Sequence, residues 1–175
     1  MILLTFADAP PFEAGHDRDN FCKDNKMIRL NLPAFDIKLR VSQGREQVLD
    51  PLRRRWVALS PEEWVRQHFT HWMISALGYP AGLMANEVKL KIGQKQLRAD
   101  SVLYDRELHP VMIVEYKAPH ISITQKVFNQ ITAYNMELHA RYLVVSNGIT
   151  HYCVKLSDDG KKYLFMDHMP RYEEL

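Results

Sequence analysis

The stretch LRADSVLYDRELHPVMIVEYKAP, residues 97–119, joins two strand-like runs through a polar turn. The first run, residues 97–104, contains Asp100 at a position where a strand of this kind would carry an apolar residue. The second run, residues 111–118, begins with four apolar residues and then changes to Glu115-Tyr116-Lys117. A buried charge costs several kcal/mol unless it is paired, hydrogen-bonded or bound to a metal. We therefore expect these three charged residues to have a specific use.

Pairing the two runs as an antiparallel hairpin brings the charges together. A turn centred between Glu107 and Leu108 would place Asp100 directly opposite Glu115, and Lys117 would share the face of Glu115 because side chains alternate along a strand. Two facing carboxylates repel each other unless a divalent cation lies between them, and their oxygen ligands suit Mg²⁺, or Mn²⁺ in its place. Lys117 could then approach a metal-bound water or the charge that develops on a phosphate.

The alternative is that Asp100 and Lys117 are exposed strand residues in surface ion pairs. An acid, a second acid 15 residues later and a lysine two residues beyond it occur together often by chance. The continuous apolar run at residues 111–114 is typical of a buried strand, however, and the charges follow it without a turn residue. This context favours the functional interpretation.

The neighbouring sequence predicts an α/β fold. Ser60 is a good helix N-cap, Pro61 suits the first helical position, and Glu63 would complete a capping box for a first helix that ends near Gly78. A second long helix is predicted at residues 123–139. The predicted strands cover residues 86–92, 97–104, 111–118, 141–146, 150–156 and 163–166. We expect a mixed β-sheet flanked by the two long helices, with a β-hairpin before the core and a short C-terminal β-hairpin.

Length and composition predict one domain. The chain has 175 residues, of which 46% are hydrophobic and 25% charged, as in ordinary globular proteins. We expect a loosely ordered arm at residues 1–26 and a single domain at residues 27–175, with Met27 as an alternative start of translation. No apolar run is long enough for a membrane span or a signal peptide, so we expect a cytoplasmic protein without membrane contact.

Charge alone does not identify a partner. The formal net charge is only +2, but basic stretches occur at residues 53–55 and 89–98. Each could face phosphate or could simply be a solvated strand face. The two cysteines give neither a disulfide framework nor a metal-ligand spacing. No G-x-x-x-x-G-K-[ST] stretch is present, so no ATP site is expected.

Several short motifs occur in an order that resembles a known family. They are Arg98-Ala99-Asp100, Glu115-Tyr116-Lys117, and Gln130-x-x-x-Tyr134 in the second helix. Together they resemble the PD-(D/E)XK nuclease superfamily, and more closely the N-terminal nuclease domain of type I restriction enzyme R subunits. The likeness runs from about residue 34 to the C-terminal end. It implies a restriction-endonuclease-like αβββαβ core. Ala99 stands where the superfamily name has Pro, and the ATP-driven motor of R subunits cannot be carried over to this chain.

The resemblance implies roles for individual residues. Asp100 and Glu115 would be metal ligands, with the backbone carbonyl of Tyr116 as a third, and Lys117 would orient or activate the attacking water. Gln130 would border the catalytic groups. Tyr134 would meet the nucleic acid or else pack in the core, and Arg98 is a candidate nucleic-acid contact. For Glu63 two interpretations remain, a helix cap and a further metal ligand.

These observations predict a Mg²⁺-dependent nuclease that hydrolyses DNA phosphodiester bonds, in restriction or another defence against foreign DNA. RNA is not excluded as a substrate. One alternative is a nuclease fold that binds nucleic acid without cleaving it. Another is a subunit of a larger assembly, with DNA and other restriction-system subunits as its partners.

Overall fold

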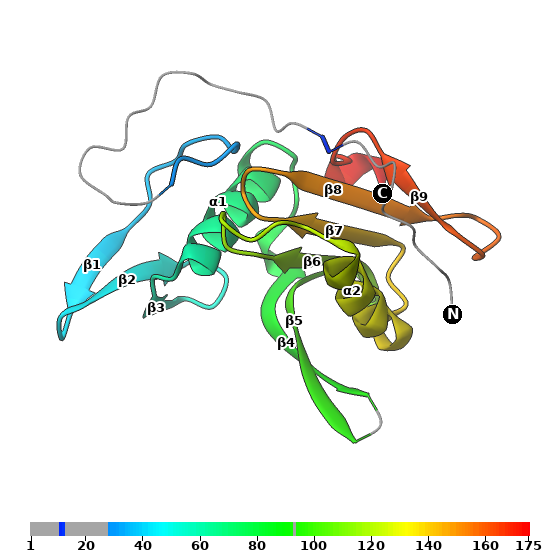
Figure 1. Ribbon diagram of the computed structural model, residues 1–175, viewed down its shortest axis with the longest axis horizontal. Coiled ribbons are helices and arrows are strands. Elements are labelled where there is room, and N and C mark those ends of the chain that lie inside the picture. Colours follow the sequence, from blue (N-terminus) through cyan, green and yellow to red (C-terminus); the bar gives the residue numbers. More distant parts are fainter. Residues whose placement is uncertain (1–10, 13–27, 93) are drawn as a thin grey trace.

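The structure is a computed structural model that describes residues 11–12, 28–92 and 94–175. Its centre is a six-stranded sheet with the strand order β4-β5-β6-β7-β8-β9 (Figure 1). Only β6 and β7 pair in parallel, so the sheet is mixed as the sequence predicts. The strands are β4 (Met84–Ile92), β5 (Lys95–Tyr104), β6 (Pro110–Tyr116), β7 (Tyr142–Ser146), β8 (His151–Leu156) and β9 (Tyr163–Met166).

Two long helices flank this sheet, and each packs on a different face. Along β6, Met112 and Val114 belong to a buried cluster with residues of α1 (Pro61–Ser75), whereas Ile113 between them belongs to a cluster with residues of α2 (Gln125–Leu138). Alternate residues of a strand point to opposite faces, so the two clusters lie on opposite sides of the sheet. Burial of both faces explains why β6 and β7 are almost uniformly apolar in sequence.

The segment before α1 forms a three-stranded sheet and not the predicted hairpin. Its antiparallel strands are β1 (Leu39–Ser42), β2 (Arg45–Asp50) and β3 (Arg55–Ala58). Pro51 interrupts the pattern of residues 46–57 because it lies in the turn between β2 and β3, where it has no ladder hydrogen bond to donate. This turn divides residues 45–58 into two strands. The predicted C-terminal hairpin is confirmed as β8 and β9.

The register of β5 and β6 matches the one expected from the sequence. Ser101 pairs with Val114 and Val102 with Ile113, and one further step in that register places Asp100 opposite Glu115. The register shifts between Leu103 and Tyr104, nearer the turn. Strand β6 ends at Tyr116, so Lys117 lies just beyond it, where its N–H donates to the Ser146 carbonyl.

Most of the predicted arm, residues 1–26, and Met27 lie outside the described residues, so the boundary between arm and domain stays a prediction. Phe12 is described. Its side chain is buried, and its N–H donates to the His151 carbonyl at 3.1 Å. No described helix is long and apolar enough to cross a membrane.

Candidate active site

Asp100 lies near the middle of β5, and its carboxylate is buried and held from two sides. Oδ2 accepts a hydrogen bond from the Tyr116 backbone N–H at 2.9 Å, and Oδ1 accepts one from Arg66 Nη2 at 2.9 Å. Burial raises the pKa of Asp100 above its ordinary value, although Arg66 and the Tyr116 N–H act in the opposite direction. The Tyr116 N–H comes from β6, so the hairpin backbone itself fixes the orientation of this acid.

Glu115 lies one residue before the end of β6 and is only 2% exposed. Its Oε1 accepts hydrogen bonds from Lys117 Nζ at 2.7 Å and from Gln130 Nε2 at 2.6 Å. Its Oε2 is buried and has no hydrogen-bond partner among the described residues. Burial first, and then the charge of Asp100, raise the pKa of Glu115 to about 7, against the effect of Lys117.

Lys117, Gln130 and Tyr134 surround Glu115. Lys117 Nζ also donates to Gln130 Oε1 at 3.3 Å, and Gln130 Nε2 lies 2.6 Å from the Tyr134 hydroxyl. Burial on its own would lower the pKa of Lys117, but the hydrogen bond and charge of Glu115 outweigh it and raise the pKa. Lys117 is thus a permanent cation at this site. Tyr134 packs in the core and its hydroxyl also contacts Gln130, and the contact expected with nucleic acid stays a prediction.

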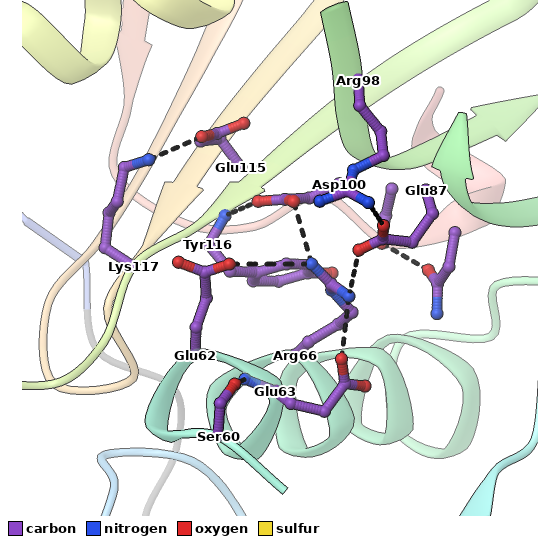
Figure 2. Close-up of polar contacts among 12 residues, drawn as sticks. Ser60, Glu62, Glu63, Arg66, Glu87, Arg98, Asp100, Glu115, Tyr116 and Lys117 are labelled. Carbon is purple, nitrogen blue, oxygen red and sulfur yellow. Dashed lines mark hydrogen bonds and ion pairs between the residues drawn. The ribbon is translucent and has the colours of Figure 1, made fainter. Parts of the chain in front are cut away.

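A buried arginine that the sequence did not single out lies at the centre of the site. Arg66, from the second turn of α1, is 3% exposed. Besides Asp100 it binds Glu63 Oε2 at 2.8 Å and Glu87 Oε1 at 2.7 Å (Figure 2). These acids raise the pKa of Arg66 although burial opposes them, so it stays charged. A charged residue between the buried Val65 and Phe69 was the signal in the sequence that could have revealed it.

The acid of α1 that lies near Asp100 and Glu115 is Glu62 and not Glu63. Ser60 Oγ accepts from the Glu63 N–H at 3.0 Å, which confirms the N-cap. The Glu63 carboxylate, however, accepts hydrogen bonds from Arg53, Arg66 and Gln67, so it does not close the expected capping box. The Glu62 carboxylate is 44% exposed, and Figure 2 shows it on the side of Asp100 and Lys117. Burial, and then the Asp100 charge, raise the pKa of Glu62.

The remaining candidates lie at different depths around the site. Arg98 lies on β5 two residues before Asp100. It is exposed and forms an ion pair with Glu87. The Tyr116 ring is fully buried under the site, and the role expected for its carbonyl stays a prediction. Arg53, from the basic stretch 53–55, does not face solvent. Its side chain is mostly covered, forms an ion pair with Asp50 and binds Glu63 at 2.5 Å.

The charges of the site leave room for a divalent cation. Three arginines and one lysine face six carboxylates, which leaves two negative charges uncompensated when every acid is ionised. The carboxylates are those of Asp50, Glu62, Glu63, Glu87, Asp100 and Glu115, and the cations are Arg53, Arg66, Arg98 and Lys117. Within the described ranges no three His, Cys, Asp or Glu side chains form a metal-binding group. Magnesium commonly uses one or two carboxylates and several waters, so Asp100 and the unpartnered Glu115 Oε2 fit it.

Comparison with known proteins shows similarity to a protein family and to a solved structure. The family model described as type I restriction enzyme R protein N terminus (HSDR_N) matches residues 61–170. The structure is described as a fragment of an HsdR subunit of a type I restriction enzyme from Vibrio vulnificus YJ016. It is 19% identical with a TM-score of 0.48, and the match covers 67% of this chain and 24% of that chain. The present chain thus spans about a quarter of that relative. No curated protein matches the chain.

Proposed function

Because the chain belongs to the family of type I restriction enzyme R protein N termini, we propose that it is a metal-dependent nuclease that hydrolyses DNA phosphodiester bonds in defence against foreign DNA. The observation that carries the proposal is the buried, unpartnered Oε2 of Glu115 beside Asp100 and Lys117. A buried carboxylate oxygen without a donor is costly, and a metal ligand is one of the few uses that offset this cost.

Asp100 and Glu115 would hold the cation, Mg²⁺ or Mn²⁺, and the Tyr116 carbonyl and Glu62 could supply further oxygen donors. The cation, when bound, would supply Lewis-acid stabilisation of phosphate charge and a more acidic water. The Tyr116 N–H and Arg66 fix the orientation of the Asp100 carboxylate, so this ligand would be held in place before a metal binds.

Lys117 contributes a fixed positive charge next to the acid pair. In the metal-free protein its pKa is raised, and this positive charge suits it to orient the attacking water and to stabilise negative charge on the phosphate. Gln130 binds both Lys117 and Glu115, so it fixes the distance between the ammonium and the carboxylate. Tyr134 in turn bonds Gln130 from the next turn of α2.

The test is cleavage of supercoiled plasmid with Mg²⁺, Mn²⁺ or chelator. Wild-type protein should nick the plasmid only with metal, and Asp100→Asn and Lys117→Ala should both abolish nicking. Lys162→Ala, on the exposed turn before β9, is a matched control that should cut normally. Cutting that survives both site substitutions, in folded proteins, would refute this assignment.

One observation favours a second function, DNA binding without cleavage by this chain alone. Both Asp100 oxygens already accept hydrogen bonds, one of them from the buried Arg66. In that case another subunit of a restriction assembly would have to shift Arg66 before the metal binds with full affinity. Mn²⁺ binding by the wild type, lost in Asp100→Asn, without any plasmid nicking would support this alternative.

A further inference from the structure

The hairpin formed by β4 and β5 extends the candidate site outward. Figure 1 shows the far end of this hairpin projecting beyond the other strands of the sheet. Asp100 lies on β5 at the base of the projecting part. Any partner bound across the catalytic acids therefore has the hairpin beside it.

The register places the exposed cations of the hairpin on one face. Lys89 pairs with Arg98 and Lys91 with Gln96, and all four side chains are exposed. On the alternate positions, Leu90 and Ala99 are buried in the cluster that contains α2. The hairpin is thus covered on one side and open on the other, and the open side carries the positive charge.

The same face carries the catalytic acid. Arg98 and Asp100 are two residues apart on β5 and therefore point to the same side, and Figure 2 shows them together with Glu87. The face thus changes from acids at its base to cations farther out. Arg98 is partly neutralised by its ion pair with Glu87. Lys89 and Lys91 form no hydrogen bond or ion pair with any described side chain, so their charges are free to meet a ligand.

We propose that the open face of the β4–β5 hairpin, formed by Lys89, Lys91, Gln96 and Arg98, is a track for the phosphate backbone of DNA beside the bond to be cut. The inference rests on the proposed nuclease function and names the surface that holds its substrate. Two residues along a strand cover about 6.8 Å, which equals two base-pair steps of about 3.4 Å along the axis of a duplex. A duplex that runs along the hairpin would therefore place phosphates within a few nucleotides of the cut bond over the track.

Contacts of this kind position DNA without reading its sequence. Their characteristic is salt dependence, because each lysine that neutralises a phosphate releases a counterion, and the slope of log K against log salt changes by about 0.9 for each contact. Removal of Lys89 and Lys91 should therefore reduce the slope by nearly two and leave the metal site intact.

The experiment is fluorescence anisotropy of a labelled DNA duplex, titrated with protein in chelator at several salt concentrations, so that binding is measured without cleavage. The variant is Lys89→Gln with Lys91→Gln. The matched control is Lys161→Gln with Lys162→Gln, which removes two exposed lysines from the turn before β9, at the opposite edge of the sheet. Thermal unfolding and Mn²⁺ binding are checked in both.

We expect the hairpin variant to bind DNA about tenfold or more weakly at 0.1 M salt, with the reduced slope, and the control to bind nearly as the wild type. Equal weakening of both variants would mean that only net charge matters and would overturn the track. Wild-type affinity in the hairpin variant would overturn it as well, with the nuclease proposal untouched. Failure of the wild type to bind DNA at all would overturn the track and the DNA substrate together.

Discussion

Glu115 is the residue whose ionisation should control metal binding. Its raised pKa, about 7, means that a proton occupies the carboxylate in metal-free protein below neutral pH. A proton and a cation compete for the same oxygens, so Mn²⁺ affinity should be constant above pH 7 and fall by roughly tenfold per pH unit below it. Calorimetric titration between pH 5.5 and 8.5 measures this.

In Glu115→Gln the amide cannot lose a proton, so Mn²⁺ binding should be weak at every pH and lack this inflection. An affinity in the wild type that stays constant down to pH 5.5 would contradict the role given to Glu115. Lys117→Gln is an informative companion, because without its opposing charge the inflection should move to higher pH.

The adjacent acids Glu62 and Glu63 should separate metal binding from stability. Glu62→Gln should weaken Mn²⁺ binding, because the Glu62 carboxylate faces the acid pair, and should change unfolding little because its side chain is half exposed. Glu63→Gln should instead destabilise the fold by about 3 kcal/mol, since it leaves Arg53 and Arg66 short of a buried partner. Urea unfolding with parallel Mn²⁺ titration compares the two, and the reverse pattern would restore Glu63 as the metal candidate.

The proximity of Asp100, Glu115 and Lys117 could be predicted from local strand geometry, whereas their chemical roles stay predictions. Asp100, Glu115 and Lys117 follow from alternation and one turn position, and the structure brings them together. The ion pair of Arg66 with Glu87 could not be found that way, because it joins a helix residue to a strand residue 21 positions later in the sequence. For Glu63, the same capping pattern that identified the helix start concealed the use of its carboxylate by two arginines.

The three-stranded sheet is joined to α1 through Arg53, which makes this small element part of the site. Arg53, in the turn between β2 and β3, pairs with the fully buried Asp50 and with Glu63 on α1. Arg53→Met should lower the free energy of unfolding by about 3 kcal/mol, because it leaves Asp50 as an unpaired buried charge.

The exposed Arg55, on β3, gives the matched control, and Arg55→Met should stay within about 0.5 kcal/mol of the wild type. Hydrogen exchange of β2 amides should accelerate in Arg53→Met and not in the control. Equal stability of the two variants would show that the small sheet is only loosely coupled to α1.

Helices and sheet strands were predictable where a local pattern was strong, and the small sheet was not. Strand β9 has the predicted bounds, and α1 begins at Pro61 directly after its cap, because turn and cap residues mark these boundaries locally. The sheet of β1, β2 and β3 is short and largely exposed, so its apolar alternation is weak. Its order comes from antiparallel pairing and from Arg53, and neither can be derived from residues taken singly.

Two buried histidines should make the whole molecule sensitive to acid. His68 packs in α1 against Trp64, and His151 lies in β8 between Ser146 and the Asn31 carbonyl. Burial lowers the pKa of each to about 4, from an ordinary value of 6.5. The unfolded chain therefore binds protons at a higher pH than the folded chain. The stability contributed by the neutral rings is present above pH 6.5 and is lost as the pH falls toward 4.

Glu115 acts in the opposite direction over part of this range. Its folded pKa is raised, so in metal-free protein its ionisation costs stability as the pH rises from about 4.5 to about 7, and its protonation restores that stability on acidification. Between pH 7 and pH 5, protonation of each histidine should lower the free energy of unfolding by roughly 2 kcal/mol. Protonation of Glu115 should raise it by a similar amount and so offset one of the two histidines. The net effect for the wild type is a moderate loss of stability.

Urea unfolding in chelator at pH 7 and at pH 5 tests this balance through differences between variants. His68→Gln and His151→Gln should each reduce the decrease in unfolding free energy between pH 7 and pH 5, whatever their effect on stability at pH 7. The control is His109→Gln at an exposed position, which should leave this decrease unchanged. Glu115→Gln should enlarge the loss, because the compensating protonation is gone. If neither histidine substitution reduces the loss of unfolding free energy, other groups cause the acid sensitivity. If the loss is smaller in Glu115→Gln than in the wild type, the wild-type Glu115 carboxylate is ionised throughout this range.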